Sequence, residues 1–152
     1  MTDGRLDPER EEALHALEDE FSALFARVRR MYLEYAARLA PGLSPAAYKL
    51  FSAIAAAGQA RPSELSERMM ADKSQVSRMV RELEGHGLIE RMPDPADGRS
   101  SLLRPTEDGL RRLTAVREGD EQRLRNSLRS WSLDDIRNLA RLLHALSSGE
   151  TP

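Results

Sequence analysis

A heptad repeat of apolar residues near the start of the chain constrains the fold more than any other feature. Between residues 9 and 40 the apolar side chains recur at alternating steps of three and four: Leu14, Leu17, Phe21, Leu24, Val28, Met31 and Tyr35. This spacing predicts one long helix with a continuous apolar seam, roughly 48 Å in length. So small a domain cannot cover such a helix, so we expect the seam to pack against a second copy of the chain. A core helix in a monomeric bundle is the alternative.

Composition limits the class of protein. The chain has 152 residues, 40% of them apolar, and no cysteine, which predicts one small domain with helical extensions and excludes disulfides and thiol chemistry. No stretch approaches the roughly 18 apolar residues of a membrane span, and the first residues lack a basic-then-apolar leader pattern. We therefore expect a soluble cytoplasmic protein with no membrane partner.

The middle of the chain, residues 43–105, predicts three short helices followed by a hairpin. Ser44 and Pro45 begin the first helix, Arg61 and Pro62 the second, and Asp72 caps the third, with Gln75 completing a capping box. Two short strands follow at 88–91 and 101–104, with a turn over 93–99 that is rich in proline, aspartate and glycine. This order predicts a winged helix-turn-helix.

Two further helices are expected after the hairpin. One begins at Thr106 and runs to about Ser130; the other follows a cap at Ser132. The buried side of the first is expected to hold Leu110, Leu113, Val116, Leu124 and Leu128. The overall prediction is a mainly α fold with a small β-hairpin wing. Its DNA-binding domain covers 43–105, and a helical dimerisation region covers 9–40 and 106–147.

The third short helix carries the residues that point to nucleic acid. At 100° per residue its apolar side holds Val76, Met79, Val80 and Leu83, and the polar side holds Ser74, Gln75, Ser77, Arg78 and Arg81. Hydroxyls and helix-start N–H groups can hold phosphates, while glutamine and arginine can read base edges. The alternative is a solvated face with the surface pairs Arg78–Glu82 and Arg81–Glu84. The whole-segment charge does not decide between them, because residues 61–104 hold eight basic and eight acidic side chains.

The hairpin adds a second candidate contact. Arg99 follows Gly98 at the expected tip, and Asp97 is near enough to brace its guanidinium or the turn. An arginine held on a rigid loop suits the negative potential of a narrow minor groove. Ordinary turn chemistry with a solvated Arg99 is the alternative.

Three motifs in this order resemble the MarR family of bacterial transcriptional regulators. They are Leu83-x-x-x-Gly87-Leu88-Ile89-x-Arg91, Asp94-Pro95-x-Asp97-Gly98-Arg99-Ser100 and Thr106-Glu107-Asp108-Gly109. The resemblance implies a homodimer that places two recognition helices in successive major grooves of a pseudo-palindromic operator in double-stranded DNA. It also implies that Ser74, Gln75, Ser77 and Arg78 face DNA, that Arg99 is the wing arginine and that Asp97 braces it. Pro105 departs from the family, which usually has an aliphatic residue there.

Other chemistry is not expected. The three histidines lie far apart, and the sequence has no phosphate loop or nucleophile motif, so we expect no catalytic residues, metal or cofactor. The resemblance implies a small aromatic or anionic effector, for which Tyr32, Tyr35, Tyr48 and Phe51 are candidates if they are not plain core. The predicted function is a dimeric, sequence-specific DNA-binding regulator, namely a repressor released by a ligand. The alternative is a winged-helix module that binds proteins or only dimerises.

Overall fold

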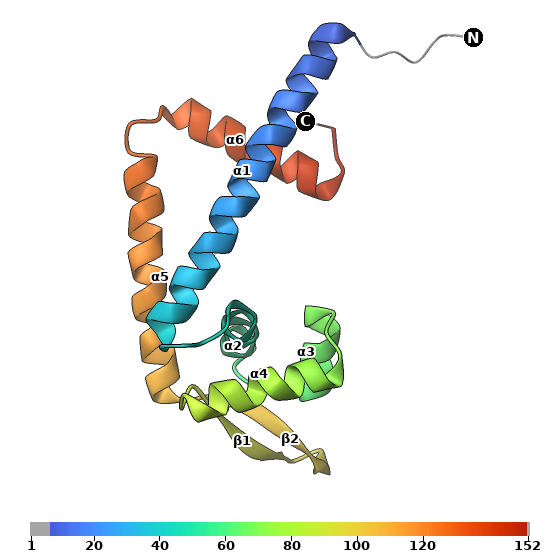
Figure 1. Ribbon diagram of the computed structural model, residues 1–152, viewed down its shortest axis with the longest axis vertical. Coiled ribbons are helices and arrows are strands. Elements are labelled where there is room, and N and C mark those ends of the chain that lie inside the picture. Colours follow the sequence, from blue (N-terminus) through green and yellow to red (C-terminus); the bar gives the residue numbers. More distant parts are fainter. Residues whose placement is uncertain (1–6, 152) are drawn as a thin grey trace, which may run out of the picture. The chain divides into compact units, whose positions relative to one another are not determined.

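A computed structural model describes residues 7–151 of the chain (Figure 1). Within that range the structure has six helices and one two-stranded antiparallel sheet, and it divides into two compact units between Leu113 and Thr114. The elements are α1 (Pro8–Leu39), α2 (Pro45–Ala57), α3 (Pro62–Met69), α4 (Lys73–Gly85), β1 (Ile89–Asp94), β2 (Asp97–Pro105), α5 (Glu107–Ser127) and α6 (Leu133–Ser148). The predicted fold class is confirmed.

Helix α1 has the predicted extent. Asp7 caps it by accepting a hydrogen bond from the Glu9 N–H, and Pro8 occupies the first turn. One side of the C-terminal end of α1 is buried, with Tyr35 and Leu39 at 5% and 2% exposure. The N-terminal part of the predicted seam is not covered by the described chain, since Leu14, Leu17 and Leu24 are 41–48% exposed.

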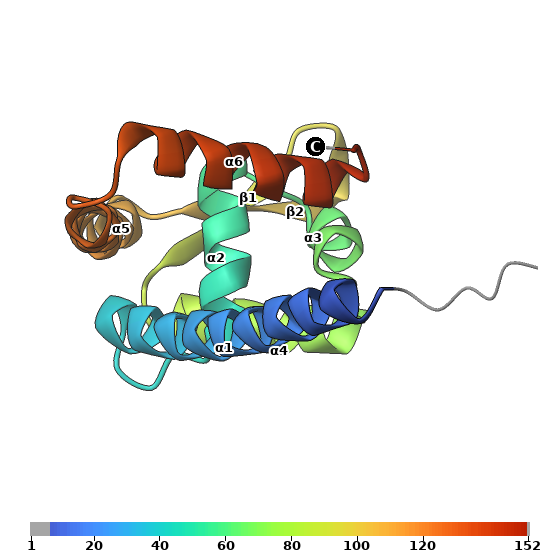
Figure 2. The same ribbon diagram turned by 90° about the horizontal axis from the view of Figure 1, so that it is seen from above.

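The core of the first unit is built around α2. Seen from above, α2 crosses the middle of this unit with α3 beside it (Figure 2). Apolar side chains from α2, α3, α4, the connection after α4 and β2 meet there with almost no exposure: Phe51, Ile54, Leu65, Val76, Val80, Leu83, Leu88 and Leu103. Burying such side chains is worth about 1.5–3 kcal/mol each before the entropic costs of folding.

The turn between α3 and α4 follows the predicted chemistry. Met70 ends α3 in the left-handed conformation, with φ of 49°. Asp72 then accepts a hydrogen bond from the Gln75 N–H at 2.8 Å, while the Gln75 side chain accepts one from the Asp72 N–H at 3.1 Å. This reciprocal capping box confirms the predicted helix start.

The hairpin differs from the prediction at its tip. The expected turn over 93–99 is mostly strand, and only Pro95 and Ala96 lie between β1 and β2. The Asp94 carboxylate accepts a hydrogen bond from the Ala96 N–H at 2.9 Å and so closes a shorter turn. At the other end, Ala60 and Leu103 exchange two backbone hydrogen bonds, which attach β2 to the segment before α3.

Helix α5 begins where expected but ends earlier. The Thr106 hydroxyl accepts a hydrogen bond from the Gly109 N–H at 3.0 Å, and α5 stops at Ser127 rather than Ser130. Leu113 and Val116 are buried, but the expected burial of Leu110 and Leu124 is wrong, since they are 42% and 61% exposed. Helical spacing identifies an apolar face without showing what covers it.

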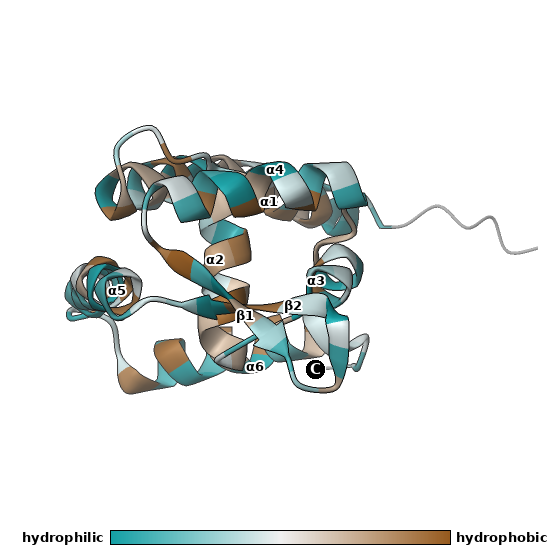
Figure 3. Cartoon of the chain, turned by 90° about the horizontal axis from the view of Figure 1, so that it is seen from below, coloured by the Kyte–Doolittle hydropathy of each residue, from teal (hydrophilic) through white to brown (hydrophobic). Residues whose placement is uncertain are grey.

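Helix α6 begins at its predicted cap, where the Ser132 hydroxyl accepts a hydrogen bond from the Asp135 N–H. Hydrophobic segments recur along this helix (Figure 3), and five of its leucines are 40–61% exposed: Leu133, Leu139, Leu142, Leu143 and Leu146. Within its own unit this apolar face is therefore exposed. The assignment of α6 and α1 to a dimerisation region remains a prediction.

Candidate nucleic-acid interface

Helix α4 has two chemically distinct faces, as predicted. Val76, Val80 and Leu83 are buried against the first unit's core. Every residue proposed to face DNA on this helix is exposed: Ser74, Gln75, Ser77, Arg78 and Arg81. The core therefore fixes which side of the helix remains available to a partner.

The acidic residues of α4 bind other elements and not its arginines. Glu82 accepts hydrogen bonds from the Ser44 N–H at 2.5 Å and from the Ser44 hydroxyl at 2.9 Å. Glu84 accepts two from the Arg91 guanidinium, at 2.7 and 3.3 Å. These contacts join the second half of α4 to the start of α2 and to β1.

The surface pairs Arg78–Glu82 and Arg81–Glu84, which belong to the alternative interpretation, are consequently absent from the described part of the chain. Arg81 donates to the Ser77 carbonyl at 3.3 Å, and Arg78 has no hydrogen bond or ion pair to any residue between 7 and 151. Both guanidinium groups are thus exposed, and neither makes a hydrogen bond or ion pair to a carboxylate of the described residues, although the charge of Arg78 helps to lower the pKa of Asp72. A solvated face held together by ion pairs, which was the alternative interpretation, is not what the structure contains.

The first turn of α4 is held by one carboxylate. Asp72 accepts hydrogen bonds from the Ser74 hydroxyl at 2.6 Å and from the Gln75 N–H, and these contacts lower the pKa of Asp72 below its usual value. The side-chain oxygen of Gln75, Oε1, accepts a hydrogen bond from the Asp72 backbone N–H. The exposed side-chain NH₂ of Gln75 is the part of this residue left to donate toward a ligand.

Arg99 is exposed on strand β2 and does not lie at the tip of the hairpin, which corrects the predicted position. Pro93 pairs with Ser101 and Asp94 pairs with Asp97, so residues 98–100 have no partner on β1 and form a bulge. Asp97 accepts a hydrogen bond from the Arg99 backbone N–H at 3.0 Å. The contact made by Asp97 therefore braces the backbone of the bulge rather than the guanidinium. Bulges of this kind re-aim a side chain.

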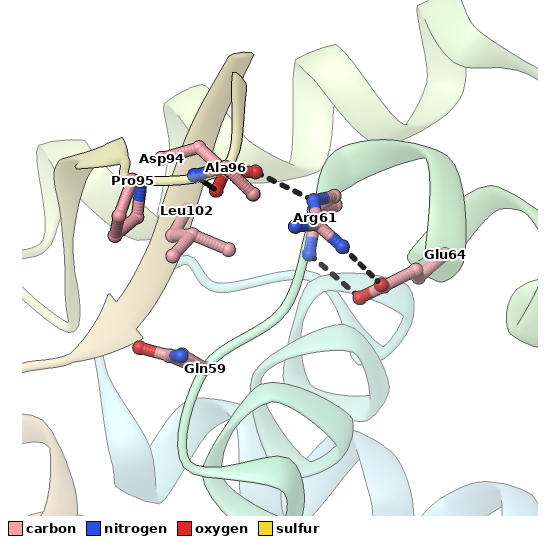
Figure 4. A pocket seen from close by; sticks show the side chains of 7 residues that line it. All are labelled: Gln59, Arg61, Glu64, Asp94, Pro95, Ala96 and Leu102. Carbon is pink, nitrogen blue, oxygen red and sulfur yellow. Dashed lines mark hydrogen bonds and ion pairs between the residues drawn. The ribbon is translucent and has the colours of Figure 1, made fainter. Parts of the chain in front are cut away.

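An ion pair beside the wing, between Arg61 and Asp94, was not predicted from the sequence. Arg61 Nε donates to the Asp94 carboxylate at 2.6 Å, and the Arg61 Nη1 group contacts Glu64 at 3.2 Å (Figure 4). An open hollow of about 330 Å³ adjoins the pair, with Pro95, Ala96 and Leu102 among its lining residues. Arg61 lowers the pKa of Asp94 by hydrogen bonding and by its charge. The two residues are 33 positions apart, so no local pattern links them.

Comparison with known proteins identifies the chain's relatives. The family model described as MarR family matches residues 43–101. The HTH-type transcriptional regulator YxaD of Bacillus subtilis, itself uncharacterized, is 32% identical over 119 residues, which cover 78% of this chain and 83% of that protein. The chain belongs to the MarR family. It is therefore a winged-helix, DNA-binding transcriptional regulator by family, as its recognition motifs indicated.

Solved MarR structures have the same fold. A MarR family protein from Bacillus stearothermophilus superimposes with a TM-score of 0.79 at 23% identity, covering 95% of this chain and 98% of that one. A mutant MarR from E. coli, complexed with operator DNA, gives a TM-score of 0.65 at 24% identity, covering 93% and 99%. The predicted winged helix-turn-helix is thereby confirmed.

The remaining sites considered from the sequence can be placed on this MarR fold. Tyr35, Tyr48 and Phe51 are buried. The rings of Tyr35 on α1 and Tyr48 on α2 pack against each other, with centroids 5.7 Å apart, while the Phe51 ring lies beside Gly109 at the start of α5. Tyr32 is half-buried, with the Lys49 ammonium 4.6 Å from its ring centre. Residues 7–151 contain no cluster of three metal-ligating side chains and no helix long and apolar enough to span a bilayer.

Proposed function

We propose that this MarR-family regulator binds a pseudo-palindromic operator as a homodimer. Each α4 enters a major groove and each Arg99 reaches a flanking minor groove. The observation that carries the proposal is the state of Arg78 and Arg81. Both are exposed on the recognition helix, while the nearby carboxylates of Glu82 and Glu84 bind Ser44 and Arg91.

The two-fold arrangement is supported by uncovered apolar surface on α1 and on α6, considered separately. Leu17 and Leu24 on α1, and Leu143 and Leu146 on α6, are 45–61% exposed. Large apolar side chains that are exposed at successive turns of one helix favour an interface. A second copy of the chain would cover these helices, and an isologous interface would give the protein the symmetry of a palindromic site.

A test of the DNA interface begins with selection of bound sequences from a random duplex pool. On a selected site, Arg78→Ala should cost roughly 1–3 kcal/mol of binding free energy per bidentate base contact and relax preference at one position per half-site. Half-site centres should lie about 10 base pairs apart. Arg117→Ala, which removes an equal charge from an exposed position on α5, serves as the matched control.

Failure of Arg78→Ala to change affinity for any selected DNA would favour a protein-binding or purely dimerising module instead. Selection that recovers no preferred DNA sequence would likewise favour a protein-binding or purely dimerising module. Assembly is tested separately by sedimentation at micromolar concentration, where the unchanged protein should be a dimer. Leu17→Glu with Leu24→Glu should lower the dimer fraction, and a fully helical monomer in the unchanged protein would contradict the two-fold frame.

We also propose that the protein represses transcription and that a small aromatic or anionic effector releases it from DNA. In the described chain the exposed edge of the aromatic cluster is Tyr32, with the Lys49 cation above its ring. An aromatic carboxylate such as benzoate could stack there and pair with that cation. Benzoate should then weaken operator binding, and Lys49→Ala should reduce this effect. An affinity unchanged by benzoate in both proteins would remove Tyr32 and Lys49 from consideration.

A further inference from the structure

The wing contains the only charged side chain that is buried among residues 7–151. Asp94 is 3% exposed and ends strand β1. One carboxylate oxygen accepts from Arg61 Nε at 2.6 Å, and the other accepts from the Ala96 N–H at 2.9 Å. A buried carboxylate needs such partners because its desolvation is costly. Arg61 is therefore the group that allows Asp94 to lie where it does.

Arg61 is itself held firmly on the helix-turn-helix. It is the residue before α3, and its N–H donates to Glu64 at 2.9 Å, while its guanidinium also contacts Glu64. The preceding residue, Ala60, exchanges two backbone hydrogen bonds with Leu103 of β2. One short segment thus contacts the base of the wing through the backbone of Ala60. The same segment contacts the end of β1 through the Arg61 side chain (Figure 4).

The position of Asp94 in the strand register connects this ion pair to Arg99. Asp94 pairs with Asp97, and the bulge that contains Arg99 begins at the next residue. Asp97 in turn accepts the backbone N–H of Arg99. A continuous series of contacts therefore runs from Arg61 through Asp94 and Asp97 to Arg99. Two-stranded hairpins have little stability of their own, so a fixed wing needs such an attachment.

We propose that Arg61 and Asp94 are positioning residues that aim Arg99 at the minor groove of the operator, without contacting the DNA themselves. This inference rests on the proposed function. Its physical content is that the ion pair restricts the wing before binding, so that DNA does not have to order it. Arg61 and Asp94 should then matter for DNA binding only as far as Arg99 does.

A double-mutant cycle tests this dependence. Asp94→Asn and Arg61→Gln should each weaken binding to a selected operator with A·T-rich flanks by about 3- to 30-fold, as expected for coupled residues. In a protein already carrying Arg99→Ala, the same substitutions should weaken binding less than twofold. Multiplicative losses in the Arg99→Ala background, or no loss in either background, would overturn the proposal.

Two controls separate aiming from general damage to the hairpin. Arg104→Gln removes an exposed ion pair with Glu90, at 2.6 Å, on the same hairpin but without a link to α3. It should leave operator affinity unchanged. Asp94→Asn and Arg61→Gln should also keep the base preferences read by α4 while losing the preference for A·T-rich flanks. Loss of folding would remove both preferences together. Equal loss of both preferences contradicts the proposal.

The Arg78→Ala variant distinguishes failure of the wing inference from failure of the proposed DNA-binding function. Arg78→Ala is measured on the same operator, and weakened binding there shows that α4 contacts DNA. If Arg78→Ala weakens binding but Asp94→Asn and Arg61→Gln do not, only the wing inference is wrong. If none of the three has an effect on any selected DNA, the DNA-binding proposal itself is wrong.

Discussion

A glycine at the start of α5 makes a sharp test of the packing. Gly109 is buried, and a Cβ atom added to it would lie 2.5 Å from the Leu88 carbonyl oxygen and 3.0 Å from Phe51 Cζ. Both neighbours are fully buried. The Leu88 carbonyl also accepts the Thr106 N–H at 2.9 Å, so it cannot shift without straining that hydrogen bond. We expect Gly109→Ala to destabilise the protein.

The magnitude follows from two opposing effects. Overpacking costs roughly 1–3 kcal/mol, and strain in the Leu88 hydrogen bond adds up to about 1 kcal/mol. The higher helix propensity of alanine offsets about 0.5–1 kcal/mol of this loss in the free energy of unfolding. The net loss should be about 1–3 kcal/mol, which for a chain of this length lowers Tm by roughly 3–10 °C.

The assay is urea unfolding followed by circular dichroism, at one fixed protein concentration because dimers unfold in a concentration-dependent way. Gly85→Ala is the matched control, since Gly85 is also helical and an added Cβ would meet nothing within 4 Å. That variant should equal or slightly exceed the unchanged protein. A Gly109→Ala protein with an unchanged or higher midpoint would refute the reasoning, as would equal losses in both variants.

Three further substitutions or conditions test other local interactions. Ser44→Ala should cost about 1–2 kcal/mol in urea unfolding, because it removes the cap of α2 and the hydroxyl contact to Glu82. Met70→Asn should raise the midpoint by a few tenths to about 1 kcal/mol, because Met70 is 95% exposed and left-handed, a conformation that asparagine tolerates better; a lower midpoint contradicts this. Asp72 and Asp94 have lowered pKa values when folded, so their stabilisation is present above their unfolded pKa of about 3.9 and is lost as the pH falls through the lower folded values. Thermal unfolding across that acidic range should therefore show a shallower loss for Asp94→Asn than for the unchanged protein.

Local sequence patterns were sufficient for most of the helices. The capping box of Asp72 and Gln75 joins residues three apart, and it forms as expected because both partners lie in one turn. Proline at the starts of α1, α2 and α3 is equally local, since its fixed φ suits a first turn. The polar face of α4 could be predicted for a related reason, namely that helical geometry alone sets which residues share a side.

The errors occur where distant residues decide the structure. The hairpin tip is shorter than its proline- and glycine-rich sequence indicates, because the Asp94 carboxylate closes the turn on Ala96 and is itself held by Arg61, 33 residues earlier. Glu82 and Glu84 are also at helical spacing from Arg78 and Arg81, a pairing considered as the alternative, but their carboxylates bind Ser44 and Arg91 instead. Spacing along a helix shows which charges are within reach of each other, while the tertiary fold decides which of them pair.

This selection of partners explains how a chain of net charge −2 can present cationic groups to a polyanion. Segment 61–104 has no net charge, with eight side chains of each sign. In the structure, however, more of the acidic than of the basic side chains have partners within the described chain. Seven of its acidic side chains make hydrogen bonds or ion pairs within the described chain: Glu64, Asp72, Glu82, Glu84, Glu90, Asp94 and Asp97. Only three basic side chains take part in those ion pairs: Arg61, Arg91 and Arg104.

Five basic side chains of the segment are exposed and have no ion pair within residues 7–151: Arg68, Lys73, Arg78, Arg81 and Arg99. They belong to α3, α4 and the wing, the elements of a winged helix that approach DNA. Phosphate binding depends on such local cations and on counterion release, not on net charge. Affinity should therefore fall steeply with salt despite the overall negative charge, and Arg99→Ala should flatten that dependence while Arg104→Gln leaves it unchanged. An affinity independent of salt would show that these five cations do not meet phosphates.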